Sequence, residues 1–434
     1  MTADGLPPGP RQPAALQTLG WLARHVPFLE RVRSDLGPTF TLRFTGMGHY
    51  VLVSDAESTK RLFGGDREHG LPEGRTRLLE PVLGLRSLLV LEGVEHMRRR
   101  RLMLPPFHGE RMRAYEGTIA TAAAKEVEGW RRGAVFEIRE RTQAITLEVI
   151  LRAVFGVTEG SRYEELREAL SVMLEASRRA FTQTIGLLTR PLGRYGPYAP
   201  FQRLVDRVDR LLAAEIAERR RAPHLDERED VLSMLVGARF DDGTSMDDAE
   251  LRDQLMTLLV AGHETTATAL AWAFDMLLHN PEVHARARAA AADGDDRYLA
   301  AVGDEAQRLR PVVPSVGRKL GVAGEYGGYE IPAEESVLVA TYLLHTNPDL
   351  YEDPYEFRPE RFLDSKPQTY AWLPFGGGIH RCLGAAFAEL ELRVVLGEVL
   401  RRVDLRPASP AAERSMLPGV TLVPIGGTRV AVAS

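Results

Sequence analysis

The hydrophobic pattern of this chain is helical over most of its length. From about Glu95 to Arg310, apolar residues recur at helical spacing among alanines, arginines and glutamates. This spacing predicts an almost wholly helical region. The pattern breaks near residues 133–135, 156–160 and 186–199, where we expect the connections between helices.

Strand-like alternation is confined to short segments outside that region. Residues 37–53 alternate well enough to predict a two-stranded hairpin that turns at Gly46–His49. The remaining predicted elements are a short helix at 55–63, strands at 317–321 and 336–340, a proline-rich coil at 348–375, a final amphipathic helix at 385–403 and a β-like tail that ends at Val432.

One helix of the central region is long and apolar. Asp247 or Asp248 is expected to cap its start, and Asn280-Pro281 to end it. Apolar residues on nearly all of its faces predict that it is buried. Its middle, Ala261–Thr266, contains a glycine, two adjacent threonines and an acid, and each of these weakens a helix.

This polar interruption suggests a site within the helix. A threonine hydroxyl that bonds a carbonyl one turn back would bend the helix and open a groove. Glu264 beside Thr265, in a buried helix, suggests proton delivery to a bound ligand. A solvent-facing polar turn is the plainer interpretation, and the apolar flanks count against it.

The overall composition excludes several classes of protein. The 434 residues are 44% hydrophobic and 26% charged, and the formal net charge of −5 gives no global reason to expect nucleic acid or an anionic membrane. We find no signal-peptide core and no apolar run that could span a membrane. A single cysteine fits a reducing compartment. We therefore expect a cytoplasmic protein, with residues 1–20 as an irregular proline-rich arm.

The only cysteine, Cys382, lies in the glycine-rich segment Phe375–Gly384. A single thiol cannot form an internal disulfide or a multi-cysteine zinc or iron–sulfur site. The glycines allow close approach to something flat or bulky, and amide dipoles at the start of the following helix favour the thiolate. Such a sulfur is a candidate axial ligand for haem iron, the alternative being a small buried hydrophobe.

Two charged groups add to the candidate chemistry. Glu305 and Arg308 lie three residues apart on one helix face; joined by Arg361 of the coil, they would lock the segment that leads to Cys382, whereas a surface pair would mean little. His96 and Arg100 share a helix face and could grip a carboxylate. The nearby arginines form either a docking patch for an acidic protein or a solvated face: Arg98, Arg99, Arg101, Arg111 and Arg113.

Together these segments resemble the cytochrome P-450 family of haem-thiolate monooxygenases, in its soluble bacterial form. Four segments match in the family's order, from residue 93 to residue 392. They are Gly93-x-x-His96-x-x-x-Arg100, Ala261-Gly262-x-Glu264-Thr265, Glu305-x-x-Arg308 with Arg361, and Phe375-x-x-Gly378-x-His380-x-Cys382-x-Gly384. Two departures are His380, where many members have arginine, and Glu264, where several bacterial members have aspartate.

The resemblance implies a mainly α fold with a small β-rich lobe, in a single domain over residues 1–434. It also implies haem b (iron protoporphyrin IX), buried between the long central helix and the cysteine-ligand loop, with Cys382 as the axial ligand of the iron. Glu264 and Thr265 would deliver protons to dioxygen. The implied haem contacts are His96, Arg100, Arg318 and His380 at the propionates, and Phe375, Gly378, Gly384, Ala261 and Gly262 around the ring.

The implied activity is hydroxylation or epoxidation of a hydrophobic small molecule such as a terpenoid, steroid, fatty acid or polyketide. Electrons would come ultimately from NAD(P)H through a ferredoxin or flavodoxin with its reductase. By analogy, the pocket would be lined by residues 69–92, the 165–205 region, Ala261, Val312–Val316 and about Met416–Val420. The apolar residues in these segments favour an apolar or amphipathic substrate: Leu71, Leu78, Leu85, Leu88, Phe181, Leu187, Val313 and Leu417. Rival interpretations are a haem-thiolate peroxygenase, isomerase or dehydratase, a non-catalytic haem sensor or carrier, and a cysteine hydrolase that uses Cys382 with His380.

Overall fold

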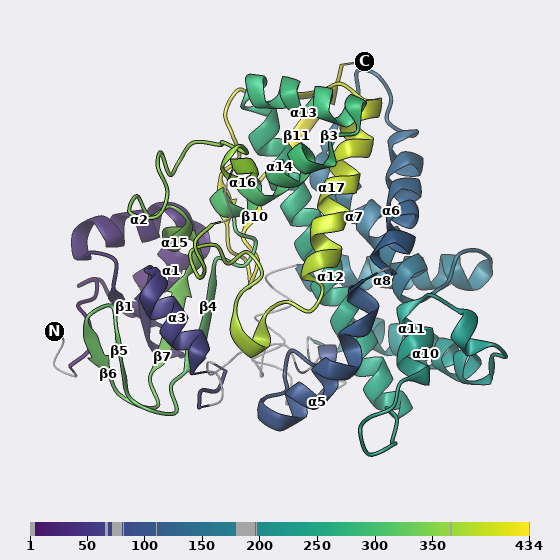
Figure 1. Ribbon diagram of the computed structural model, residues 1–434, viewed down its shortest axis with the longest axis horizontal. Coiled ribbons are helices and arrows are strands. Elements are labelled where there is room, and N and C mark those ends of the chain that lie inside the picture. Colours follow the sequence, from purple (N-terminus) through teal and green to yellow (C-terminus); the bar gives the residue numbers. More distant parts are fainter. Residues whose placement is uncertain are drawn as a thin grey trace. The chain divides into compact units, whose positions relative to one another are not determined.

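A computed structural model gives the fold, and it describes residues 5–65, 68–71, 80, 82–109, 111–178, 196, 198–364 and 367–433. Helices predominate among them and the sheets are small, which confirms the predicted fold class (Figure 1). The chain forms two compact units. The first unit comprises residues 1–73, 123–142 and 265–434, and the second comprises 74–122 and 143–264. The single domain predicted over the whole chain stays a prediction.

The first unit contains most of the strands. Its helices are α1 (Ala14–Ala23), α2 (His25–Leu36), α3 (Ala56–Gly64), α13 (Pro281–Asp293), α14 (Asp296–Leu309), α15 (Thr341–His345), α16 (Arg361–Asp364) and α17 (Ala385–Arg402). Its main sheet has the order β1-β2-β7-β4, formed by Phe40–Phe44, Gly48–Val53, Ser336–Ala340 and Ser315–Lys319. The smaller sheets are β5–β6 (Gly324–Tyr326, Tyr329–Ile331), β3-β11-β8 (Val135–Glu137, Arg429–Val432, Leu405–Pro407) and β9–β10 (Ser415–Met416, Val423–Pro424).

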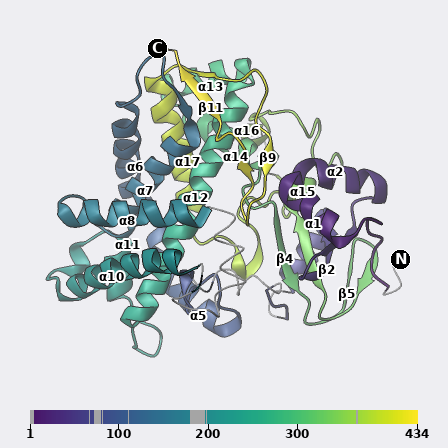
Figure 2. The same ribbon diagram turned by 180° about the vertical axis from the view of Figure 1, so that it is seen from behind.

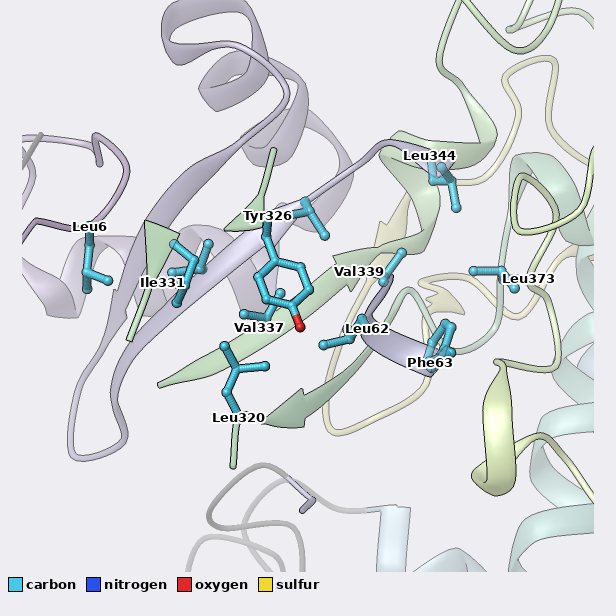
Figure 3. Close-up of a cluster of buried hydrophobic side chains, with 12 residues drawn as sticks. Leu6, Leu62, Phe63, Leu320, Tyr326, Ile331, Val337, Val339, Leu344 and Leu373 are labelled. Carbon is cyan, nitrogen blue, oxygen red and sulfur yellow. The ribbon is translucent and has the colours of Figure 1, made fainter. Parts of the chain in front are cut away.

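The main sheet is buried on both faces. Along β7, Val337 and Val339 point into one apolar cluster with Leu62 and Phe63 of α3 (Figure 3). Leu338, between the two valines, packs in a second cluster on the opposite face, because side chains alternate along a strand. The sheet therefore holds β4, and the residues it carries, on a rigid support.

The second unit is helical and contains α5 (Gly93–Met103), α8 (Ser161–Arg178), α10 (Ala199–Arg221) and α11 (Val231–Gly237). Three helices continue from one unit into the other: α6 (Arg111–Val127), α7 (Ile138–Val149) and α12 (Asp248–Leu278). Asp247 caps α12, since its carboxylate accepts a hydrogen bond from the Glu250 N–H at 2.8 Å. The helix runs unbroken through Ala261–Thr266 and ends at Leu278, before Asn280-Pro281 as predicted.

Several predicted elements are confirmed, and others lie a few residues from their predicted positions. The hairpin forms between β1 and β2, but its turn falls at 45–47, where Gly46 has a positive φ of 76°. Strand β7 occupies the predicted 336–340, whereas β4 begins at Ser315 instead of residue 317. The predicted break at 186–199 lies largely outside the described residues. Among the described helices, none is both long and apolar enough to pass through a bilayer.

Strands β3, β5 and β6 were not predicted. Strand β3 lies inside the region predicted to be helical, at one of its breaks, and pairs with β11 near the end of the chain. Its formation depends on a partner far away in the sequence, so no local pattern reveals it.

Candidate functional site

Cys382 lies on a loop closed by its own backbone. The Cys382 N–H donates to the carbonyl of Phe375 at 2.9 Å. Gly376 and Gly378 adopt positive φ angles of 68° and 67°, which favour glycine. Helix α17 begins at Ala385, so the sulfur lies within one turn of a helix N-terminus, and the cysteine is exposed. The loop therefore presents Cys382 at its surface.

Strand β4 places Arg318 against the same loop. The guanidinium is buried, with the residue 2% exposed, and donates to the carbonyls of Gly317 at 2.9 Å and Gly377 at 3.2 Å. It also lies 4.9 Å from the ring centre of Phe63. A β-carbon on Gly377 would approach Phe63 to 2.6 Å, so this position requires glycine. The first unit thus brings Arg318 together with the loop that carries His380 and Cys382.

The three charged residues Glu305, Arg308 and Arg361 meet in the first unit. Glu305 and Arg308 are both fully buried, and the Arg308 Nε and Nη2 atoms lie 2.7 and 2.8 Å from the two carboxylate oxygens. Arg361 Nε lies 3.1 Å from Glu305 Oε1. A buried pair of this kind needs its remaining donors satisfied.

Backbone carbonyls of the coil supply those acceptors. Arg308 donates to the carbonyls of His345, Pro354 and Glu356 at 2.8, 2.7 and 3.0 Å. The trio is therefore the anchor of the coil that leads from α15 toward the Cys382 loop.

His345 links this anchor to the approach of the Cys382 loop. Its Nε2 accepts from the Leu373 N–H at 2.7 Å, and its Nδ1 lies 3.2 Å from the carbonyl oxygen of Arg308. Burial, followed by the nearby Arg308 charge, lowers the pKa of His345 to about 3. The ring is therefore neutral and carries its proton on Nδ1. Sequence reasoning missed this residue, because no motif in the chain connects position 345 with position 373.

In the second unit, helix α7 holds the polar turn of α12. Glu264 Oε2 accepts from Gln143 Nε2 at 2.7 Å. One turn further along α7, Thr146 Oγ1 lies 2.8 Å from Nδ1 of the buried His263. Gln143 and Thr146 were not predicted; their three-residue spacing on one helix face is visible in the sequence, but their partner helix is not.

The polar turn is half-buried where it carries the predicted haem and proton-delivery residues. Ala261, Gly262, Glu264 and Thr265 all have intermediate exposure. A β-carbon on Gly262 would meet its nearest side chain, Ile150, at 3.6 Å, an ordinary contact. Close packing against α7 or the π-helical turn that follows it (Ile150–Val154) therefore does not require glycine at position 262.

Helix α5 carries the remaining predicted haem contacts. His96 is 2% exposed and Arg100 is half-buried. Two arginines of the proposed docking patch have acidic partners within the second unit: Arg98 pairs with Asp242 at 2.5 Å, and Arg99 pairs with Glu95 and Glu250. Asp242 lies on the loop before α12, whereas Glu95 belongs to α5 and Glu250 to the first turn of α12. Arg101, Arg111 and Arg113 remain exposed.

The predicted pocket wall is described only in part. Leu71, Leu88 and Leu417 are buried, whereas Leu85 is 67% exposed. Leu78, Phe181 and Leu187 lie outside the described residues. Gln254 Oε1 accepts from the Leu88 N–H at 3.1 Å, and Ser87 and Thr257 join their hydroxyls at 2.6 Å. These bonds fasten the 86–88 segment to α12.

The donor set of the first unit fits a haem. An exposed sulfur on a glycine-rich loop, within a turn of a helix and beside a buried arginine, defines a haem-thiolate class of protein. Comparison with known proteins agrees with this class. The family model of cytochrome P-450 matches residues 7–429.

Named relatives and a solved structure extend the match. Cytochrome P-450 135B1 of Mycobacterium tuberculosis is 42% identical over 99% of this chain and 91% of its own length. Cytochrome P-450 137 of the same species is 36% identical over 99% and 91%. The structure of retinoic acid-bound cyanobacterial CYP120A1 matches with a TM-score of 0.82 and 25% identity, over 98% of this chain and 99% of its own.

The chain therefore belongs to the cytochrome P-450 family. It is a haem-thiolate monooxygenase, an oxidoreductase whose cofactor is haem iron with a cysteine thiolate. The names of the two mycobacterial relatives state the family and no substrate.

Proposed function

We propose that this protein activates O2 at haem b bound to the thiolate of Cys382, and hydroxylates or epoxidises a hydrophobic small molecule. The observation that carries the proposal is the exposed Cys382 on a loop bonded to the buried Arg318. When bound, the haem would supply oxygen activation and oxygen transfer, to which a thiolate ligand would contribute electron density.

The residues around the cofactor each have a proposed part. Cys382 binds the iron, and Phe375, Gly378 and Gly384 shape the loop that presents it. Ala261 and Gly262 would contact the ring, as the family motif at these positions implies. The propionates are bound by His96, Arg100, Arg318 and His380, as the family motifs at these positions imply. His380, in place of arginine, makes its propionate contact dependent on pH.

Glu264 and Thr265 are the proposed proton-delivery pair. The support is the position of both residues, half-buried, on the polar turn of α12. Gln143 holds the Glu264 carboxylate at 2.7 Å and so fixes its rotamer. The carboxylate can accept a proton from solvent, and the Thr265 hydroxyl can pass one on toward dioxygen.

The substrate is a terpenoid, steroid, fatty acid or polyketide, and the electrons come from NAD(P)H through a ferredoxin or flavodoxin with its reductase. The apolar residues that the family analogy assigns to the pocket, among them Leu71, Leu88 and Leu417, support an apolar substrate. We place the enzyme in the cytoplasm, the compartment that supplies NAD(P)H. A compound library, screened by shifts in the haem absorption band on binding, would identify the substrate.

The decisive experiment is the absorption difference spectrum of the reduced protein with carbon monoxide. Wild type is expected to show the displaced band that a thiolate ligand produces, and Cys382→His to lose it while still binding haem. Purified protein that stays colourless after incubation with haemin would contradict the proposal. Turnover with peroxide alone, and none with reductant and O2, would favour the peroxygenase alternative.

A further inference from the structure

The coil before the Cys382 loop carries a row of three aromatic rings. Phe362 of α16, Trp372 and Phe375 follow one another, with ring centres 5.3 Å apart for the first pair and 6.5 Å for the second. The second pair is edge to face, with the ring planes at 87°. Phe375 is also the residue whose carbonyl accepts the Cys382 N–H. The row therefore runs from the loop of the proposed iron ligand to α16, where Phe362 is half-buried.

The backbone is fixed on both sides of Trp372. The Tyr351 hydroxyl donates to the carbonyl of Ala371 at 3.1 Å, and the Leu373 N–H donates to His345 Nε2 at 2.7 Å. At the outer end of the row, α16 packs against α14 within the first unit (Figure 2). These contacts hold the indole in a defined position between the two phenylalanines.

Packing alone does not explain a tryptophan at position 372. Its Nε1 is buried and has no hydrogen-bond acceptor among the residues that the structure describes. Trp130, in contrast, donates to the Glu126 carboxylate at 3.2 Å, and Trp272 donates to a backbone carbonyl at 2.8 Å. An unsatisfied buried donor costs stability, and a phenylalanine would fill the row without that cost. The property that distinguishes an indole from the rings on either side is its ease of oxidation.

The surroundings of Trp372 favour a reversible loss of one electron. Because no described group accepts the Nε1 proton, an oxidised indole keeps this proton and remains a cation that can be reduced again. The two phenylalanines are much harder to oxidise, so Trp372 is the oxidisable ring of the row. The established haem-thiolate chemistry supplies the oxidant, since haem that has reacted with peroxide accepts single electrons.

We propose that Trp372 is a redox-active residue, which gives an electron to haem that peroxide has oxidised in the absence of substrate and regains it from a reductant at the protein surface. Two such electrons, with two protons, convert one molecule of hydrogen peroxide into two of water. Ascorbic acid supplies both electrons and both protons and becomes dehydroascorbic acid. The route protects the haem when no substrate consumes the oxidant. The proposal rests on haem binding at Cys382, and it is independent of the substrate and the redox partner.

The test is reaction of the haem-loaded protein with hydrogen peroxide in the absence of substrate, followed by rapid freezing. We expect wild type to show a tryptophan radical by electron paramagnetic resonance, and peptide mass spectrometry to find oxygen added at Trp372. Trp372→Phe keeps an aromatic ring in the row and should lose both signals, with faster bleaching of the haem. Ascorbate should suppress the oxygen addition in wild type, and protein without haem should show none.

Two further variants complete the experiment. Trp130→Phe is the matched control, because Trp130 also packs on a phenylalanine, with its ring centre 5.0 Å from that of Phe136, and this variant should leave the radical unchanged. Trp372→Tyr restores an oxidisable ring, so a tyrosine radical should replace that of tryptophan, even where Trp372→Phe is poorly folded.

The reduced carbon monoxide spectrum separates this proposal from the proposed function. Wild-type protein that lacks the thiolate-type spectrum contradicts haem binding at Cys382, and with it both proposals. Wild-type protein that has this spectrum but forms no radical overturns the role of Trp372 alone. A tryptophan radical that persists in Trp372→Phe, or equal oxygen addition at Trp130 and Trp372 in wild type, also overturns it.

Discussion

At the scale of single residues, an exposed ionisable side chain can bind a ligand, whereas a buried one affects the stability of the fold. Cys382 is exposed and is the proposed iron ligand, whereas Glu391, nine residues later in the chain, is 2% exposed on α17. Burial raises the pKa of Glu391 to about 8. A carboxyl of this kind is neutral in the folded protein and ionised in the unfolded chain at neutral pH.

Glu391 therefore makes stability depend on pH. Its contribution is complete below the ordinary carboxyl pKa and is lost as pH rises toward 8, because the folded protein holds a proton that the unfolded chain has released. The free energy of unfolding should fall by about 1.4 kcal/mol per pH unit from this group. Glu391→Gln, a neutral side chain of equal shape, should flatten this slope and be more stable than wild type at pH 8.

Denaturant unfolding of both proteins between pH 5 and pH 8 measures the difference. Buried His25, whose pKa burial lowers to about 4, contributes a slope of opposite sign below pH 6.5. The comparison of Glu391→Gln with wild type cancels that contribution. Parallel pH profiles for the two proteins would show that Glu391 ionises normally in the folded state.

A second residue-scale prediction concerns Thr265. Thr265→Ala should retain haem and substrate binding, because the hydroxyl takes no part in either. Product formed per NAD(P)H consumed should fall by about tenfold, with hydrogen peroxide released in its place, since protons no longer arrive in order. Measurement of NAD(P)H, product and peroxide in one assay gives the ratio, and Thr266→Ala is the matched control. Unchanged coupling would exclude Thr265 from proton delivery.

At the scale of elements, the contacts that matter join segments without local sequence signals. Apolar residues on nearly all faces located α12, an amphipathic pattern located α17, and the Asp247 cap was among the two predicted. The strand pairing of β3 with β11 was not predictable, since each strand has only a few residues and gains its stability from the other. The hydrogen bond from Gln143 of α7 to Glu264 of α12 was not predictable either, because it joins two helices that are far apart in the sequence.

His345 allows an element-scale test of how α14 and α15 support the Cys382 loop. Asparagine can replace its Nδ1–H donor to the Arg308 carbonyl, and glutamine can replace its Nε2 acceptor for the Leu373 N–H. His345→Asn should lose about 1–3 kcal/mol of stability, because the buried Leu373 N–H is left without an acceptor. It should also lower the fraction of protein with the thiolate-type carbon monoxide spectrum.

His345→Gln is the conservative counterpart. It keeps the acceptor near Leu373 and should preserve most of the thiolate-type spectrum, even where its stability is reduced. Equal loss of that spectrum in both variants would show that His345 stabilises the fold without positioning the loop.

At the scale of the whole molecule, the net charge of −5 hides local differences in surface charge, which affect the binding of a charged partner protein. Arg98 and Arg99 have close acidic partners in the same unit. Arg101, Arg111 and Arg113 are exposed, and Arg101 makes only a long ion pair, at 3.8 Å, with the fully exposed Asp241. An acidic redox protein would therefore meet the second group. Surface charges of this kind act mainly on association rate and are screened by salt.

The prediction is that R101E, R111E and R113E together slow reduction by a ferredoxin or flavodoxin by about tenfold at low ionic strength. The rates of variant and wild type should converge in high salt. Stopped-flow reduction under carbon monoxide measures both, with Arg406→Glu, at an exposed arginine of the first unit, as control. Equal rates at every ionic strength would remove these arginines from docking.

The sequence by itself determined the helical class, the single thiol ahead of α17 and the order of the four family motifs. These features could be predicted because each depends on a few neighbouring residues. They are the periodicity of the helices, their caps and the chemistry of one cysteine. Only the tertiary structure decided that Arg318 bonds the Gly377 carbonyl, that His345 bridges Arg308 and Leu373, and that the Trp372 N–H is buried. These features depend on contacts between segments that are distant in the sequence. Only those contacts determine which polar atoms are buried.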